Sequence, residues 1–341
     1  MLDRISSYLH CLENPAQWAV ATIVSAHGSS PSPVGTSMAI SAELEIIGSL
    51  SGGCVESSVA VAAQDAISDG TVQRVSFGPD GTPFGQAGLG VTLTCGGEIE
   101  VLIQPLITAD LAPLQELSVT DPRSAATLTR SMTDHMGTRF TVEEHRDAAP
   151  RLILSGVHDF SVHLAQLAVQ AGWRVDMVEL RPAFGTEKRI PSGVDLDMGN
   201  PSSVVADLLS QPQDSWTGVL VMTHHPDLDV PVLDAALSWA AEKSESDDAR
   251  RFIGAMGSRS SAARRDAALA DLGHSAEDRA RVVSPLGLDL GAESPAEAAV
   301  SMMAQLIAAK NAATAAPLAQ RTGPINSGRP RSLSIIREMA V

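Results

Sequence analysis

The residues best suited to chemistry lie in one glycine-rich turn, residues 48–56, with the sequence GSLSGGCVE. A β-forming run precedes this turn, and a helical pattern extends from it to about residue 69. Such a turn directs backbone N–H groups and the positive end of the helix dipole toward its contents, so it suits an anion. The same field favours the thiolate form of Cys54, which attacks electrophiles and binds soft metals. The alternative is a buried cysteine that follows a structural turn.

A second cysteine stands beside a glycine pair at Cys95-Gly96-Gly97, just before a predicted strand over residues 99–103. If the two loops converge, both cysteines line one pocket with a floor of glycine backbone. The alternative is that each glycine pair serves only a tight turn or a bulge. The residues predicted to form this binding site are Ser51, Gly52, Gly53, Cys54, Glu56, Cys95, Gly96 and Gly97.

Composition narrows the possible partners of the 341-residue chain. The formal net charge is -16 and aromatic residues make up only 3%, which argues against nucleic acid and against anionic membrane surfaces. An anionic ligand would need local N–H groups and arginines, because the overall field repels it. The 3 cysteines form no CxxC pair, and the sequence shows no signal peptide and no membrane-spanning apolar run. We expect a cytoplasmic protein.

The order of predicted elements indicates an α/β fold in two parts. Residues 1–107 form an α+β domain with the Gly-Gly-Cys motif, and residues 108–150 form a β-containing connecting segment. From residue 151, buried strands alternate with helices, which is typical of a Rossmann-like parallel sheet extending to residue 311. Residues 4–13 are predicted to form an amphipathic helix. Residues 312–341 have the composition of a mobile basic tail, with a docking segment as the alternative.

The first strand–helix turn of the second part departs from the dinucleotide fingerprint G-x-G-x-x-G. Gly156 supplies the first glycine, but His158 and Ser161 occupy the second and third positions. Glu179 ends the next strand, where an acid would bind a ribose. The imidazole at residue 158 would obstruct ordinary pyrophosphate binding, so NAD(P) is left open but not favoured.

Polar residues follow two further strands of the predicted sheet. Thr223 and His224 come after one strand, and Ser258 and Arg259 come after another, at the edge where ligands bind parallel sheets. Adjacent histidines in an extended chain point to opposite sides, so pocket lining is favoured over metal binding for His224. Ser258 and Arg259 could clamp an anion, or they could belong to a structural turn with a solvated arginine. We predict no catalytic residue.

Taken together, these segments resemble the XdhC/CoxI family, accessory proteins of xanthine dehydrogenase and related molybdenum hydroxylases. The matching segments are residues 28–35, 48–56, 95–97, 223–224, 252–259, 284–292 and 294–297. The family's second domain usually has the fuller fingerprint G-x-G-H-x-[AG]. Here His158 and Asp159 replace its second glycine and its histidine, which puts any nucleotide role of this half in doubt.

The resemblance implies a carrier rather than a turnover enzyme. Such a protein binds molybdenum cofactor, protects it while a cysteine desulfurase installs the sulfido ligand, and delivers it to the apo-hydroxylase. Cys54 would then be a molybdenum contact, and a homodimer is left open. Two alternatives remain: an NAD(P)-dependent Rossmann oxidoreductase, and a docking module for a hydroxylase that binds no ligand.

Overall fold

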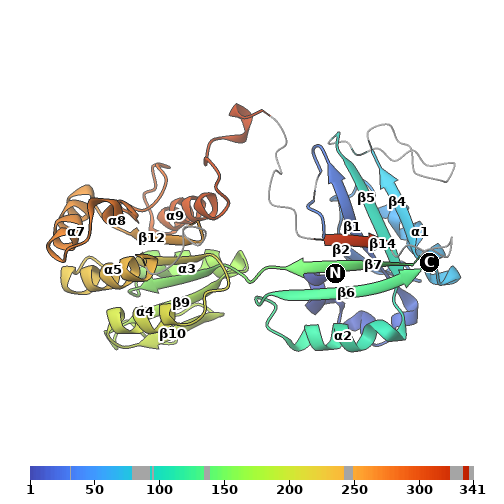
Figure 1. Ribbon diagram of the computed structural model, residues 1–341, viewed down its shortest axis with the longest axis horizontal. Coiled ribbons are helices and arrows are strands. Elements are labelled where there is room, and N and C mark those ends of the chain that lie inside the picture. Colours follow the sequence, from blue (N-terminus) through green and yellow to red (C-terminus); the bar gives the residue numbers. More distant parts are fainter. Residues whose placement is uncertain are drawn as a thin grey trace. The chain divides into compact units, whose positions relative to one another are not determined.

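The computed structural model describes residues 1–30, 32–78, 93, 96–133, 139–241, 249–322 and 333–337 (Figure 1). The chain divides into two compact units. The first unit contains Met1–Asp147 together with Leu318–Val341, and the second contains Ala148–Pro317. The segment 108–150, expected to be a connector, therefore belongs almost entirely to the first unit.

A five-stranded antiparallel sheet with the order β3-β2-β1-β5-β4 forms the centre of the first unit. The elements up to this sheet's last strand are η1 Leu2–Tyr8, η2 His10–Leu12, η3 Pro15–Gln17, β1 Trp18–His27, β2 Ser37–Ser41, β3 Ile46–Gly48, α1 Glu56–Asp69, β4 Gln73–Phe77 and β5 Glu98–Pro105. The prediction of one amphipathic helix over residues 4–13 is wrong, because this segment forms short 3-10 helices instead.

The two faces of this sheet are covered differently, as the alternation of β1 requires. Ala19, Ala21 and Ile23 point to one face, where they pack with the small residues of α1. Trp18 and Val20 point to the other face, where they pack with η1 and α2 (Thr108–Val119). Apolar burial on both faces therefore fixes the position of α1, and with it the turn that precedes α1.

A second sheet of the first unit has the order β14-β7-β6, all antiparallel. Its strands are β6 Ala126–Thr133, β7 Arg139–Arg146 and β14 Leu333–Arg337, and η4 spans Leu318–Gln320. Strand β14 lies inside the segment expected to be a mobile tail. Leu333 and Ile335 pack with Phe140 and Val142, so residues 333–337 form a strand of the first unit.

The second unit contains a six-stranded parallel sheet with the order β10-β9-β8-β11-β12-β13, as the predicted Rossmann-like architecture requires. Its elements are β8 Arg151–Ser155, α3 Asp159–Gln170, β9 Arg174–Glu179, β10 Val194–Met198, α4 Pro201–Ser210, β11 Thr217–Val221, α5 Pro226–Ala241, β12 Arg251–Ala255, α7 Arg259–Asp271, α8 Ala276–Ala280, β13 Val282–Val283 and α9 Pro295–Lys310.

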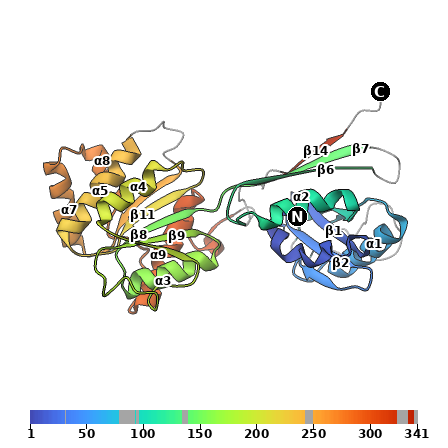
Figure 2. The same cartoon turned by 90° about the horizontal axis from the view of Figure 1, so that it is seen from below.

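Helices cover both faces of this sheet (Figure 2). Leu152 and Leu154 face α3 and α9, whereas Ile153 between them faces α4 and α5. Two helices of this unit begin with a capping residue followed by proline. Asn200 accepts backbone hydrogen bonds at the start of α4, and Ser294 caps α9 with Pro295 at its first position. Strand order reverses between β8 and β11, which is the topological switch point where α/β sheets bind ligands.

Candidate functional site

The Gly-Gly-Cys turn joins β3 to α1 at one edge of the first sheet. Gly52 and Gly53 have φ values of +77° and +121°, which residues other than glycine rarely adopt. Both residues are exposed, and a Cβ atom added at either would meet nothing within 4 Å. The two glycines therefore leave open space next to Cys54, where a bulky group can approach the backbone.

Glu56 holds this turn from the inside. Its carboxylate accepts hydrogen bonds from five backbone N–H groups at 2.7–3.2 Å and from two serine hydroxyls at 2.7 Å. The donors are the N–H groups of Leu50, Ser51, Gly52, Gly53 and Val55 and the hydroxyls of Ser49 and Ser51. We expected these backbone amides to face an external anion, but they donate their hydrogen bonds to the carboxylate of Glu56.

These donors keep Glu56 ionised. Burial would raise the pKa of this carboxyl, yet the Ser51 and Ser49 hydrogen bonds outweigh burial and hold it far below its usual range. Glu56 is also the first residue of α1, where a negative charge complements the helix dipole. The positive end of α1 is therefore already matched by an internal anion, which changes the role predicted for Gly52 and Gly53.

The thiol of Cys54 lies between this turn and the core. Its backbone N–H donates to Ser51 Oγ at 2.9 Å, and its half-buried side chain packs at the rim of the cluster under α1. Cys11 is fully buried, and burial raises the pKa of its thiol to about 12. Cys54 is therefore the better placed of these two cysteines to meet a ligand.

The second glycine pair lies at the same end of the strands of this sheet as the Gly-Gly-Cys turn. Gly48 ends β3 opposite Met38, and His27 at the end of β1 pairs with Glu98 at the start of β5. The loops after β3 and before β5 therefore leave the sheet in the same direction, as the convergent arrangement requires. Cys95 lies outside the described residues, so its place relative to Cys54 stays a prediction.

Gly96 and Gly97 have different surroundings. A Cβ atom at Gly96 would meet nothing within 4 Å, whereas one at Gly97 would overlap the carbonyl group of Ser29. Gly97 is thus needed for close packing of the loop after β1, which is the structural alternative for this residue.

In the second unit, the loop after β8 and the segment after β11 contact each other at the switch point. The ring of His158 contacts the carbonyl oxygen of Met222 at the end of β11. A Cβ atom at Gly156 would overlap Thr223 Cγ2, so the loop after β8 packs directly against the segment after β11. The sequence-based objection to ordinary pyrophosphate binding therefore has a structural counterpart.

Glu179 is engaged in the same way. Its carboxylate accepts from the Val157 N–H at 2.9 Å and from the Arg181 guanidinium at 2.9 Å through two nitrogens. Burial would raise the pKa of Glu179, but the Arg181 and Val157 hydrogen bonds lower it to about 2. The acid at the ribose position is thus an anchor for the loop after β8.

The remaining candidates of the second unit lie farther along the sheet edge. His224 is exposed, and its Nδ1 would lie 3.5 Å from a Cβ atom at Gly257. Ser258 caps α7 by accepting from the Ser261 N–H, and Arg259 is exposed. The structure therefore brings Gly156, His158, Glu179 and Thr223 into one cluster, and it places His224 and Ser258 near Gly257.

Two features of this unit were missed. Arg265 on α7 donates to Asp229 through two nitrogens at 2.9 and 2.7 Å, and both side chains are buried. No local pattern reveals this pair, because the residues are far apart in sequence. The second feature is a cavity of about 350 Å³ between the segment after β13 and α9.

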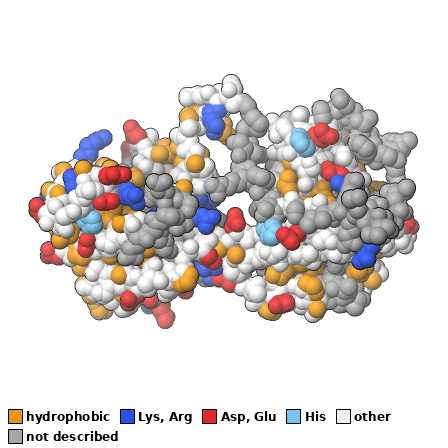
Figure 3. Space-filling view, viewed as in Figure 1, with side chains coloured by type: hydrophobic (Ala, Val, Ile, Leu, Met, Phe, Trp, Pro, Cys, Tyr) orange, Lys and Arg blue, Asp and Glu red, His pale blue; other side chains and the backbone are white. Residues whose placement is uncertain are grey.

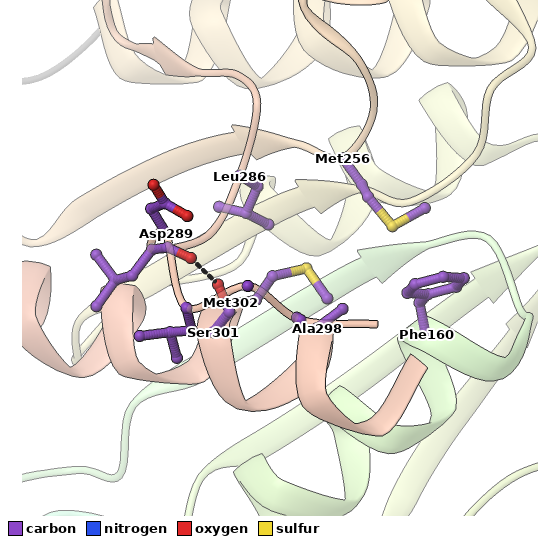
Figure 4. Close-up of a pocket in the computed structure, with 11 residues that line it drawn as sticks. Phe160, Met256, Leu286, Asp289, Ala298, Ser301 and Met302 are labelled. Atoms are coloured by element: carbon purple, nitrogen blue, oxygen red, sulfur yellow. Dashed lines mark hydrogen bonds between the residues drawn. The ribbon is translucent and has the colours of Figure 1, made fainter. Parts of the chain in front are cut away.

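Apolar side chains dominate the walls of this cavity (Figure 4). Phe160, Met256, Leu286 and Met302 lie around it, and the Ser301 hydroxyl donates to the Leu288 carbonyl oxygen at its rim. Its walls include much of residues 284–292, which the sequence marked only as a matching motif. That motif of small and apolar residues around glycines was the available signal.

On the face in Figure 3, acidic and basic side chains are interspersed over both units. Within the described ranges, no group of three or more His, Cys, Asp or Glu side chains is arranged to hold a metal ion. None of the described helices is both long and apolar enough to cross a membrane.

A Gly-Gly-Cys turn on an antiparallel unit, combined with a Rossmann-type second unit, defines the class of protein. A family model described as the XdhC Rossmann domain matches residues 152–306, and one described as the XdhC and CoxI family matches residues 11–78. Together these models match more than half of the chain. The chain belongs to the XdhC and CoxI family, as its motifs predicted.

Individual relatives agree with this membership. The chain is 27% identical to a Bacillus subtilis protein described as a probable xanthine dehydrogenase subunit, over 87% of this chain and 94% of the relative. It is 24% identical to the molybdenum cofactor insertion chaperone PaoD of Escherichia coli, over 84% and 81% of the two chains. A crystal structure described as a xanthine dehydrogenase from Bacillus halodurans shares the fold, with a TM-score of 0.67, 21% identity and coverage of 93% and 98%.

Proposed function

We propose that this protein binds molybdenum cofactor, holds it while its sulfido ligand is installed, and inserts it into a molybdenum hydroxylase of the xanthine dehydrogenase type. The names of the two relatives support this role, since one is a molybdenum cofactor insertion chaperone and the other is described as part of a xanthine dehydrogenase. The cofactor is cargo here, so the protein is a carrier. A cytoplasmic location, a cysteine desulfurase as a second partner and a homodimer belong to the same proposal.

The observation that carries the proposal is the geometry around Cys54. Two exposed glycines leave open space beside a half-buried thiol at the start of α1. A thiolate is a soft ligand that suits a molybdenum–sulfur centre. The donor set therefore fits the metal end of the cofactor, and Cys54 is the residue we assign to that end.

Glu56 acts on this site indirectly. Because its carboxylate takes the amides of Gly52 and Gly53, these amides shape the turn rather than bind the cofactor's phosphate. The proposed site therefore recognises the metal centre through the thiol and through the space above the glycines. Glu56 is a positioning residue for Cys54.

The test is cofactor content after expression with molybdate in a host that makes molybdenum cofactor. We expect molybdenum and pterin to co-purify with the wild type, and Cys54→Ala to lose most of both without unfolding. Cys11→Ala is the matched control, because it removes a buried thiol from the same unit. Equal retention by the wild type and Cys54→Ala would refute the assignment of Cys54.

A second measurement tests delivery. The loaded protein is incubated with cofactor-free xanthine dehydrogenase-type hydroxylase, and recovered hydroxylase activity is followed over time. We expect the wild type to restore activity and the Cys54→Ala preparation to restore little. Retention of cofactor without any transfer to the hydroxylase would separate storage from insertion and contradict the carrier role.

A further inference from the structure

The cavity beside α9 lies where parallel α/β sheets bind ligands. Phe160 is in the first turn of α3, after β8, and Met256 directly follows β12. Leu286 comes after β13. Because these strands are parallel, all three residues lie at the carboxyl edge of the sheet, where ligands of α/β folds bind. The cavity volume of about 350 Å³ is in the range of small-molecule sites.

The segment 287–294, which supplies one wall of this cavity, is fixed to α9 at both ends. Near its start, the Ser301 hydroxyl donates to the Leu288 carbonyl oxygen at 2.5 Å (Figure 4). At its end, the Glu297 carboxylate accepts from the Ser294 N–H at 3.0 Å. Since both ties are made within the chain, the cavity is formed before any ligand arrives.

The stretch between these ties offers hydrogen-bonding groups to the cavity. Residues 289–292 line it and are exposed, and their N–H groups have no acceptor among the described residues. Asp289 adds a carboxylate to the same wall. A carboxylate accepts hydrogen bonds from N–H groups and repels anions, so this wall favours an uncharged ligand with N–H donors.

The other walls of the cavity are apolar. The ring of Phe160 and the side chains of Met256, Leu286 and Met302 lie around it (Figure 4). Aromatic and thioether side chains make favourable contacts with flat aromatic rings. A sugar or a phosphate group would lose its hydrogen bonds to water against these walls, and an alkyl chain would leave the peptide groups of residues 289–292 unused.

We propose that this cavity binds a flat, uncharged, fused heterocycle with an amide edge, which is the chemistry that pterins and purines share. The faces of such a ring are apolar and suit Phe160, Met256 and Met302. Its perimeter carries N–H and C=O groups, which suit Asp289 and the peptide groups beside it. The site is independent of the role proposed for Cys54, because it requires neither a metal nor the first unit.

Calorimetric titration of the full chain with pterin, and separately with hypoxanthine, tests the site. A ring of about a dozen non-hydrogen atoms should bind with a Kd on the order of 10–100 μM. Binding of pterin alone identifies a pterin as the ligand, and binding of hypoxanthine alone identifies a purine. Either result, or binding of both, supports the site, and no saturable binding of either ring would overturn it.

Only the pterin result would bear on the proposed function. Cys54→Ala should bind either ring as the wild type does, because Cys54 belongs to the other unit. Failure of this site and failure of the assignment of Cys54 are therefore distinguishable.

Ala298→Leu tests the cavity by filling it. Ala298 on α9 lines the cavity, so a larger side chain should occupy the space and weaken binding about ten-fold. Ala296→Leu is the matched control, since Ala296 is exposed on the same helix and does not line the cavity. Equal affinity of the wild type and Ala298→Leu would show that the ring binds elsewhere.

Asp289→Asn tests recognition of the amide edge. Asparagine keeps one carbonyl oxygen and replaces the other with an NH2 group, which opposes the N–H donors of the ring. We expect binding to weaken about five-fold. Glu293→Gln is the control, because it removes the same charge from an exposed neighbour that does not line the cavity. Unchanged affinity in Asp289→Asn, or equal weakening in both variants, would contradict the proposed contact.

Discussion

Glu56→Gln tests whether one carboxylate organises the turn before α1. Glutamine keeps one carbonyl oxygen and replaces the other with an NH2 group. If the oxygen stays in the place of Oε1, the bonds to Oε2 from the Gly53 and Val55 amides and from the Ser51 hydroxyl are lost, and donors face donors. The two amide bonds alone, at about 1 kcal/mol each, weaken the local structure by about 2 kcal/mol.

Hydrogen exchange reports this change directly. A loss of about 2 kcal/mol raises the exchange rate of a protected amide about 30-fold when exchange follows local opening. We therefore expect mass spectrometry of the peptide over residues 49–56 to show much faster exchange in Glu56→Gln. The effect should be confined to this peptide, because α1 is held by its own packing against the sheet.

Glu43→Gln is the control, since Glu43 is exposed on the turn between β2 and β3. It removes the same charge and should leave the exchange of residues 49–56 unchanged. Exchange in Glu56→Gln that matches the wild type would refute the idea that the carboxylate holds the turn. The same variant should also lose cofactor in the retention assay, if Glu56 positions Cys54.

Two further predictions concern stability. Gly156→Ala should lower the free energy of unfolding by about 2–4 kcal/mol, because φ at this residue is +109° and the new methyl group meets Thr223. Gly172→Ala is the control, because φ is +80° but no atom lies within 4 Å of the added Cβ atom. In the same thermal unfolding measurement, this control should lower the free energy of unfolding by only about 1–2 kcal/mol. Burial would raise the pKa of Glu144, but the Met1 ammonium and Arg130 lower it to about 2. The ionised carboxylate of Glu144 therefore stabilises the folded protein fully above about pH 4.3, and this stabilisation is lost as the pH falls toward 2. Urea midpoints should drop over that range, and Glu144→Gln should flatten the drop.

Local patterns predicted much of the fold. The parallel sheet of the second unit and the starts of α4 and α9 follow from alternating buried strands and from proline after a capping residue. Strand β10 was missed because it is only partly buried, and α2 because Pro113 interrupts its pattern. Strand β14 was missed because a pairing partner almost two hundred residues away leaves no local signal.

The local pattern predicted the turn that carries the proposed site, whereas the binding role of its residues stays a prediction. The pattern of glycine, cysteine and helix start located the turn, because φ values and helix dipoles are local properties. The sequence analysis did not predict which group accepts hydrogen bonds from the amides of the turn. The acceptor is Glu56, and its place at the first position of the helix was the available signal. The pair of Arg265 with Asp229 depends on tertiary contact alone, so only the structure reveals its unfilled nitrogen.

The pairing of β14 with β7 has a consequence for the order of folding during synthesis. The ribosome releases β6 and β7 first, then the whole second unit, and only afterwards residues 333–337. The outer edge of β7 must therefore wait, with unpaired N–H and C=O groups, until nearly all of the chain has emerged. The second unit is in effect an insertion within the first. The sheet of β6, β7 and β14 can therefore be completed only after the whole second unit has been synthesised.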